Sequence, residues 1–142
     1  MAGICFFFES EDIDVWSGKD LDAWHYAAAA AGDIDRIHIV NKTNMELKNP
    51  DIGRYEFTIS KELPSLEGRV TKLVTPWEAN KHALSIWEWN HSTDWYVFGP
   101  ALGWRSEPLD EPEVYVPQAG LGALHSVHVA SIVMTNRYWV IG

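Results

Sequence analysis

The chain has 142 residues, 46% of them hydrophobic, which is the size and composition of a single globular domain spanning residues 1–142. Its formal net charge of -9 argues against a surface that binds nucleic-acid phosphates throughout. No apolar run approaches the ~20 residues of a membrane span, and the first residues lack the basic region of a signal peptide. We therefore expect a cytoplasmic protein without a membrane anchor.

Positive charge is concentrated in the middle of the chain. Residues 36–81 contain eight Lys or Arg and six Asp or Glu, whereas acids outnumber bases eight to one in residues 1–35 and six to two in residues 82–142. Residues 36–81 are thus the segment that we expect to meet an RNA, although solvated surface charges explain these scattered bases equally well. Eight tryptophans also favour an aromatic interface or stacking surface in addition to a core.

The first forty residues predict a strand, a helix and a second strand. Residues 3–9 are apolar and read as a buried strand, and Ser17 begins a helix with the spacing of a capping box. Gly32 ends this helix, and residues 36–41 form the next strand. Such a unit has parallel strands and a right-handed crossover. The single cysteine, Cys5, falls in the first strand and is expected to be a packed, inert thiol.

The remaining chain alternates further strands and helices. Thr75-Pro76 followed by Glu78 is typical of a helix start. We predict strands at residues 54–60, 69–75, 94–99 and 114–117, and helices from Thr75 to about Trp89 and from Gly122 to about Arg137. Leu124, Val127, Ser131 and Met134 are expected on one face of the last helix, and Val129, Ile132 and Val133 widen its apolar surface. This order predicts an α/β sandwich, in which ligands bind at the carboxyl ends of the strands.

The stretch YVFGPALGW, residues 96–104, is an apolar strand that stops at Gly-Pro. Glycine lets another molecule approach the backbone closely, and proline fixes the turn. Two interpretations remain open from these residues alone: a tight surface turn, or a strand end that offers backbone groups to a small ligand.

The order of short motifs resembles the ribose 2′-hydroxyl branch of the SPOUT-superfamily RNA methyltransferases. That branch has a strand ending in F-G, a loop, a short strand ending in a hydrophobic residue and proline, and a helix. The matching residues are Val97, Phe98, Gly99, Val116, Pro117, Gly120, Val127, Val129 and Ala130, with Ala23, Ala28, Ala30 and Gly32 in the first helix. The resemblance spans nearly the whole chain.

The resemblance implies a parallel sheet flanked by helices, a carboxyl-terminal deep trefoil knot and a homodimer. It also implies that S-adenosylmethionine is held in loops after three strands, largely through backbone groups. One wall of this cofactor site would consist of Phe98, Gly99, Pro100 and Gly103, and the others of Val116, Pro117, Gly120 and Leu124.

The usual catalytic side chains of that branch are replaced here. Tyr26 stands where the branch has arginine, Ala101 where it has glutamate, and Ser126 where it has asparagine. Tyr26 either positions a substrate or packs in the interior. Arg105 either contacts an anionic substrate or is a surface charge paired with Glu107.

Two histidines, His125 and His128, share one face of the last predicted helix. They are open to three interpretations: a polar contact near the cofactor site or dimer interface, a solvated or capping role, or a metal site. No cysteine or glutamate completes a recognised zinc spacing beside them.

These observations favour an S-adenosylmethionine-binding, SPOUT-like protein that is a divergent methyltransferase acting on RNA or on a small molecule. The alternative is a non-catalytic module that binds or sequesters a nucleoside-containing small molecule or a protein partner. A third interpretation treats the chain as a flavodoxin-like or other open α/β domain.

Overall fold

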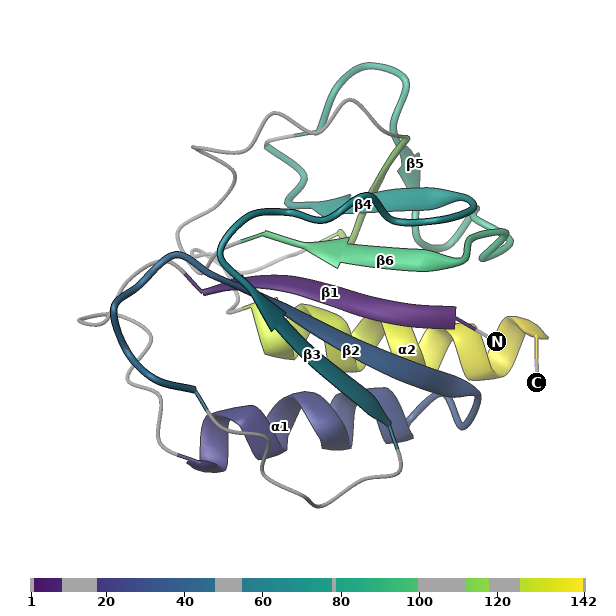
Figure 1. Ribbon diagram of the computed structural model, residues 1–142. Helices are drawn as coiled ribbons and strands as arrows, with labels where there is room; N and C mark the ends of the chain where they lie inside the picture. The colour runs from purple at the N-terminus through teal and green to yellow at the C-terminus, as the bar shows by residue number, and fades with distance from the viewer. Residues whose placement is uncertain are drawn as a thin grey trace.

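The fold is built on one parallel sheet of seven strands (Figure 1). The computed structural model describes residues 2–8, 18–47, 55–77, 79–99, 112–117 and 126–141, with the backbone alone for residues 18–22 and 126. The strands are β1 (Ala2–Phe8), β2 (Ile34–Asn41), β3 (Glu56–Ser60), β4 (Val70–Val74), β5 (Leu84–Ser85), β6 (Trp95–Phe98) and β7 (Glu113–Tyr115). Their order is β3-β2-β1-β6-β4-β7-β5, and every described pairing is parallel.

The predicted strand–helix–strand unit at the start of the chain is confirmed. Helix α1 (Gly18–Ala29) joins β1 to β2, which pair in parallel with Phe6 opposite Ile39. Trp24 of α1 stacks on the Phe6 ring at a centroid distance of 3.9 Å. Gly32 has a φ of 82°, a left-handed conformation that ends the helical segment and that glycine adopts without strain.

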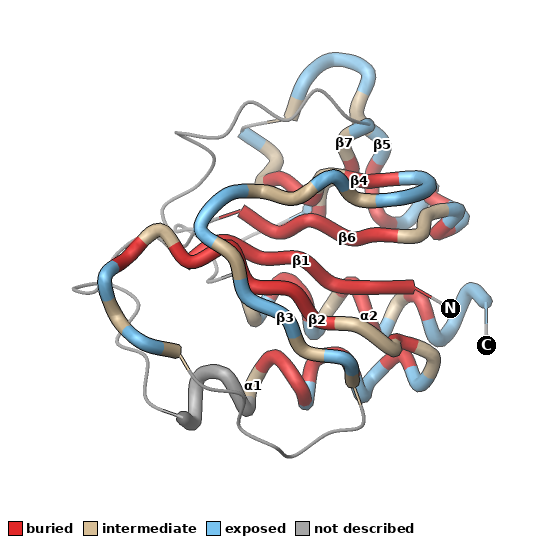
Figure 2. The backbone as a smooth tube through the Cα atoms, in the orientation of Figure 1, coloured by how far each residue is buried: buried red, intermediate tan, exposed pale blue. Residues whose placement is uncertain are grey.

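Both described helices pack on the same face of the sheet. The buried side chains of α1 and of α2 (Ser126–Ile141) belong to one core cluster together with Ile4, Phe6 and Phe8 of β1. The intervening Cys5 and Phe7 point to the other face, where the described contacts come from the loop residues Leu63 and Leu66. β1 and β6 are buried along their full length (Figure 2). They therefore form the centre of the sheet.

The helix predicted from Thr75 to about Trp89 is wrong. The described residues of this stretch form turns and the short strand β5, because polar side chains satisfy backbone groups that a helix would use. Asn80 Oδ1 accepts a hydrogen bond from the His82 amide, and Ser85 Oγ accepts one from the Trp87 amide. The Asn80 amide in turn donates to Glu113 Oε1 at 2.9 Å.

A return segment, residues 86–93, follows β5. At its start the Ile86 amide donates to the Tyr115 carbonyl beyond the β5–β7 pairing. Just after its end the Asp94 amide donates to the Arg69 carbonyl beside the start of β6. The segment therefore runs back from the edge strand β5 to the start of β6 in the middle of the sheet, and it buries Ile86, Trp89 and His91 on the way.

The last helix is longer than predicted. α2 continues four residues past Arg137 to Ile141, and its buried side chains include Val129, Val133 and Met134. Ser131 is exposed and Met134 is buried, so the predicted common face is only partly buried. The buried face includes Arg137 instead. Neither described helix has the length and apolarity that crossing a membrane requires.

Candidate functional site

The carboxyl ends of three adjacent strands form the edge at which the sequence predicted a ligand. Strand β4 lies between β6 and β7, with Leu73 opposite both Phe98 and Val114. This register brings Gly99 and Val116 to the same edge, on either side of the end of β4. β6 lies between β1 and β4, two strands that precede it in the sequence, so the chain reverses its direction of strand addition here. Open α/β sheets bind ligands at such points.

The predicted cofactor residues that the structure describes offer mainly backbone groups. The side chains of Phe98 and Val116 are buried in the core that contains both helices, and Phe98 contacts Trp24 at a ring distance of 5.6 Å. Gly99 is buried, whereas Pro117 is exposed at the surface. Of the remaining predicted cofactor residues, Pro100, Gly103, Gly120 and Leu124 lie outside the described residues. Residues 100–111 and 118–125, whose crossings would define a knot, also lie outside them.

The predicted catalytic residues are only partly described. Tyr26 on α1 is 70% exposed, so its interpretation as a packed side chain is wrong for this chain. The neighbouring His25 is buried against the rings of Tyr55 and Phe57, with centroid distances of 5.3 and 5.9 Å. The two side chains thus lie on different sides of α1. Arg105 lies outside the described residues, and only the backbone of Ser126 is described, at the first position of α2.

Tyr26 lies far from the start of its helix. α1 begins at Gly18, and a rise of ~1.5 Å per residue puts Tyr26 about 12 Å further along the axis. The helix leads from the carboxyl end of β1 toward the amino end of β2, so Tyr26 lies displaced from the carboxyl edge of its own sheet.

The described histidines and Cys5 form no metal site. His128 is exposed on α2, and His125 lies outside the described residues. Within the described part of the chain, no three His, Cys, Asp or Glu side chains are grouped so that they could hold a metal ion. Cys5 is fully buried, and burial raises the pKa of its thiol to about 12, which keeps it protonated and unreactive.

Several bases of residues 36–81 are neutralised by partners. Arg36 pairs with Asp35 at 3.3 Å, Lys42 with Glu62 at 2.7 Å and Lys72 with Glu113 at 3.3 Å. Arg36 also lies over the Trp95 ring, 4.4 Å from its centroid. These pairs weaken the positive potential that an RNA would meet in this segment.

A polar cluster between α2 and the sheet, buried at three of its five residues, was not predicted from the sequence. It consists of Asp33, His91, Tyr96, Asn136 and Arg137. Arg137 is only 6% exposed and donates to Asp33 Oδ1 at 2.9 Å, to Asp33 Oδ2 at 2.7 Å and to Tyr96 Oη at 2.9 Å. The sequence did hold one sign of this cluster. Arg137 is the only Asp, Glu, Lys or Arg in the described helix α2, and a buried charge requires a partner.

No protein-family profile matches the sequence, and no curated protein matches it either. A protein solved in a study of the 2-OH methylation of C/U34 on tRNA superimposes with a TM-score of 0.63 and 16% identity, covering 96% of this chain and 93% of its own. A TrmH/SpoU tRNA-modifying enzyme of A. aeolicus has a TM-score of 0.62 and 10% identity, covering 97% of this chain and 73% of its own.

This chain has the fold of RNA ribose methyltransferases. A probable methylase family protein from Haemophilus influenzae Rd KW20 gives a TM-score of 0.69 at 10% identity over 98% of this chain and 64% of its own length. The predicted resemblance is thereby confirmed at the level of three-dimensional structure. Identities this low show the fold alone.

Proposed function

We propose that this chain is a single-domain, S-adenosylmethionine-dependent RNA methyltransferase of the SPOUT type, with altered catalytic residues. The observation that carries the proposal is the convergence of the β6, β4 and β7 carboxyl ends in a fold shared with RNA ribose methyltransferases. Divergence in sequence is compatible with retained binding, because a ligand held by peptide groups tolerates side-chain changes.

The residues at this edge suit an adenosine-bearing cofactor. Gly99 has no side chain to block an approaching ring, and the side chains of Phe98 and Val116 turn into the core. Peptide N–H and C=O groups near Gly99 and Pro117 are therefore the groups that we expect to hold the adenine. The proposal includes the expected carboxyl-terminal trefoil knot, and it keeps Pro100, Gly103, Gly120 and Leu124 as further cofactor-binding residues.

Transfer would rest on few side chains. Bound S-adenosylmethionine supplies an electrophilic methyl group. A ribose hydroxyl is a poor nucleophile near neutral pH, so the chain would have to hold the acceptor in line with that methyl group while the hydroxyl proton passes to water. We assign this positioning to the Tyr26 hydroxyl. We further assign a contact with the acceptor to Ser126 and a contact with an RNA phosphate to Arg105.

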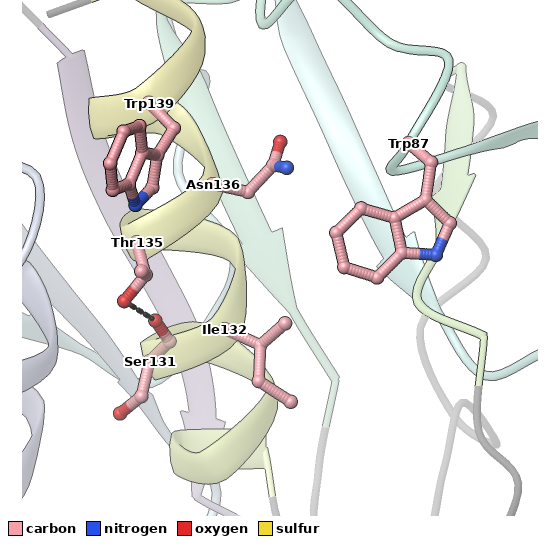
Figure 3. Close-up of a pocket in the computed structure, with 6 residues that line it drawn as sticks. All are labelled: Trp87, Ser131, Ile132, Thr135, Asn136 and Trp139. Atoms are coloured by element: carbon pink, nitrogen blue, oxygen red, sulfur yellow. Dashed lines mark hydrogen bonds between the residues drawn. The ribbon is translucent and has the colours of Figure 1, made fainter.

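A homodimer is part of this proposal, for two reasons. Tyr26 is exposed and displaced from its own carboxyl edge, which suits a role at the site of a partner subunit. The end of α2 exposes four consecutive apolar or aromatic side chains, Tyr138, Trp139, Val140 and Ile141. A groove of about 460 Å³ runs between this helix and Trp87, and Figure 3 shows Ile132 and Asn136 in the interval. Exposed apolar side chains gathered at one helix end are typical of an interface.

Calorimetry with S-adenosylmethionine and S-adenosylhomocysteine tests the cofactor site. We expect micromolar binding of both to the wild type and at least a ~10-fold loss in Gly99→Val, since a branched side chain would occupy the backbone approach. Glu56→Gln, exposed at the amino end of β3, is the matched control and should bind like the wild type. Absence of heat with either ligand at high micromolar concentration would contradict the proposal.

A second function is favoured by the substituted motif residues. Tyr26 and Ala101 stand where the related branch has arginine and glutamate, and a chain that retains ligand binding alone would sequester a nucleoside-containing molecule. Transfer of a labelled methyl group to bulk RNA separates the two functions. Binding accompanied by transfer supports the enzyme, and binding without transfer supports the sequestering module.

A further inference from the structure

His91, in the return segment, occupies a constrained position between α2 and β6. It is 2% exposed and has a φ of 59°, a left-handed conformation that is uncommon for any residue but glycine. Its Nδ1 lies 2.8 Å from Tyr96 Oη, and its Nε2 lies 2.5 Å from Asn136 Oδ1. Trp89 packs on the ring at a centroid distance of 4.6 Å. Both ring nitrogens are therefore engaged.

The proton positions in this cluster follow from the donors around it. Arg137 Nη1 can only donate, so Tyr96 Oη accepts its hydrogen bond. Burial raises the pKa of Tyr96 to about 12, so its hydroxyl keeps its proton and donates it to His91 Nδ1. His91 Nε2 then carries the ring proton and donates to Asn136 Oδ1. The chain of hydrogen bonds runs in one direction and requires the neutral Nε2–H tautomer of His91.

A second proton on His91 would disrupt this chain. Nδ1 would become a donor facing the hydroxyl proton of Tyr96, and the ring would become a cation beside Arg137, whose Nη1 lies 3.5 Å from the His91 carbonyl. The charged and titratable groups facing His91 are Arg137 of α2 and Tyr96 of β6. Asp33, before β2, lies beyond Arg137 and already accepts two hydrogen bonds from it. No carboxylate among the described residues contacts the ring to compensate its charge.

We propose that His91 is an acid-sensitive latch that holds the carboxyl-terminal half of α2 on the sheet while its ring is neutral and releases it when the ring is protonated. Of the three hydrogen bonds made by the ring and by Tyr96 Oη, two are to side chains of α2, Asn136 and Arg137. Loss of these bonds frees the end of the helix, whose last four residues are already exposed. The latch stands on this geometry whether or not the chain transfers methyl groups.

The sign of the pH dependence follows from the surroundings of the ring. Burial lowers the pKa of His91 below 6.5, Arg137 lowers it further, and the bond to Asn136 partly offsets them. The released ring therefore binds protons from about pH 6.5 downward, while the latched ring does not. The free energy of release should fall as the pH drops below that value and be constant above it.

Hydrogen exchange and ring NMR test the latch. In the wild type we expect the amides of residues 133–141, corrected for intrinsic rates and compared with those of β1, to lose about tenfold protection between about pH 7.5 and about pH 5.5. His91→Asn should abolish this pH dependence, because asparagine tolerates the left-handed backbone and cannot be protonated in this range.

The matched control is His38→Asn. Burial also lowers the pKa of His38, but its ring bonds to Thr58 and Ser60 of β3, away from α2. This variant should therefore keep the acid-dependent loss of protection in α2. Equal loss in His91→Asn and in the wild type would overturn the proposal. Should His91→Asn fail to fold, the wild-type ring decides: an Nδ1–H tautomer, or a titration midpoint above 6.5, would overturn it too.

Discussion

Asp33 and Arg137, separated by 104 positions in the chain, form a bidentate pair in which both carboxylate oxygens accept a guanidinium hydrogen bond. The pair joins the turn between α1 and β2 to the last full turn of α2. Because Arg137 also donates to Tyr96, one side chain connects both helices' ends with the centre of the sheet. The contact that joins α2 to the α1–β2 turn and to β6 is thus polar, although most of the core is apolar.

Replacing Arg137 with methionine should destabilise the protein by about 3 kcal/mol. The substitution leaves Tyr96 Oη without its donor in the interior, whereas Asp33 is partly exposed and regains some hydration. Urea denaturation followed by circular dichroism measures the loss. Arg137→Lys keeps the charge but not the two parallel bonds, so it should fall between the wild type and methionine. A loss below about 1 kcal/mol for Arg137→Met would show that the pair is not a stabilising element.

The same pair predicts that the free energy of unfolding falls at acidic pH. The hydrogen bond from Arg137 lowers the pKa of Asp33 below its ordinary 3.8. The stabilisation is therefore fully present above about pH 3.8 and is lost as the pH falls through the lower, folded-state value. Asp33→Asn should reduce the slope of unfolding free energy against pH in this range and leave the region near pH 6.5 unchanged. An unchanged fall at acidic pH in Asp33→Asn would contradict this assignment.

Cys5 should be unreactive in the folded protein. Its thiol is fully buried in β1, so a reagent cannot reach it. Burial also raises the pKa of the thiol to about 12, so the reactive thiolate does not form at about pH 8. A thiol-reactive dye should label the native chain at least ~100-fold more slowly than the chain in denaturant. Similar rates in both conditions would show that β1 opens readily, which the burial of that whole strand argues against.

Tyr26→Phe tests the proposed positioning role without disturbing the fold. The side chain is mostly exposed, so the unfolding free energy should change by less than about 0.5 kcal/mol. Methyl transfer should fall about tenfold while S-adenosylhomocysteine binding is retained, because only the acceptor loses a contact. Full transfer activity in Tyr26→Phe would discard the role of the hydroxyl.

The sequence predicted those parts of the fold that depend on local apolar patterns. Runs such as Trp95–Phe98 are buried on both faces, and a buried parallel strand is continuous in hydrophobicity. The order of these strands and the glycine and proline after them also led to the edge that holds Gly99 and Val116. Predicting this edge depended on where the backbone of each strand ends and less on which side chains lie there.

The failures have a common cause in polar side chains that bond to distant or non-helical partners. The stretch after Thr75 has a capping pattern, but Asn80 and Ser85 bond to nearby amides and the segment pairs with β7. The last helix was predicted to end at about Arg137, because a charged side chain is normally exposed to solvent. Its partner lies 104 positions away, and no local pattern reveals such a contact.

Gly3 is required by the side chain that packs across it. A Cβ at this position would lie 2.7 Å from Trp95 Cζ3 and 2.8 Å from Cε3, closer than carbon atoms approach without displacement. The Trp95 ring is buried and covered by Arg36 at 4.4 Å, so it has little room to move. Gly3→Ala should therefore destabilise the protein by about 1–3 kcal/mol in urea denaturation, despite the higher strand propensity of alanine. In a Trp95→Leu background the smaller side chain removes the clash, and the same substitution should have a much smaller effect. Equal effects in the two backgrounds would show that Gly3 matters for another reason.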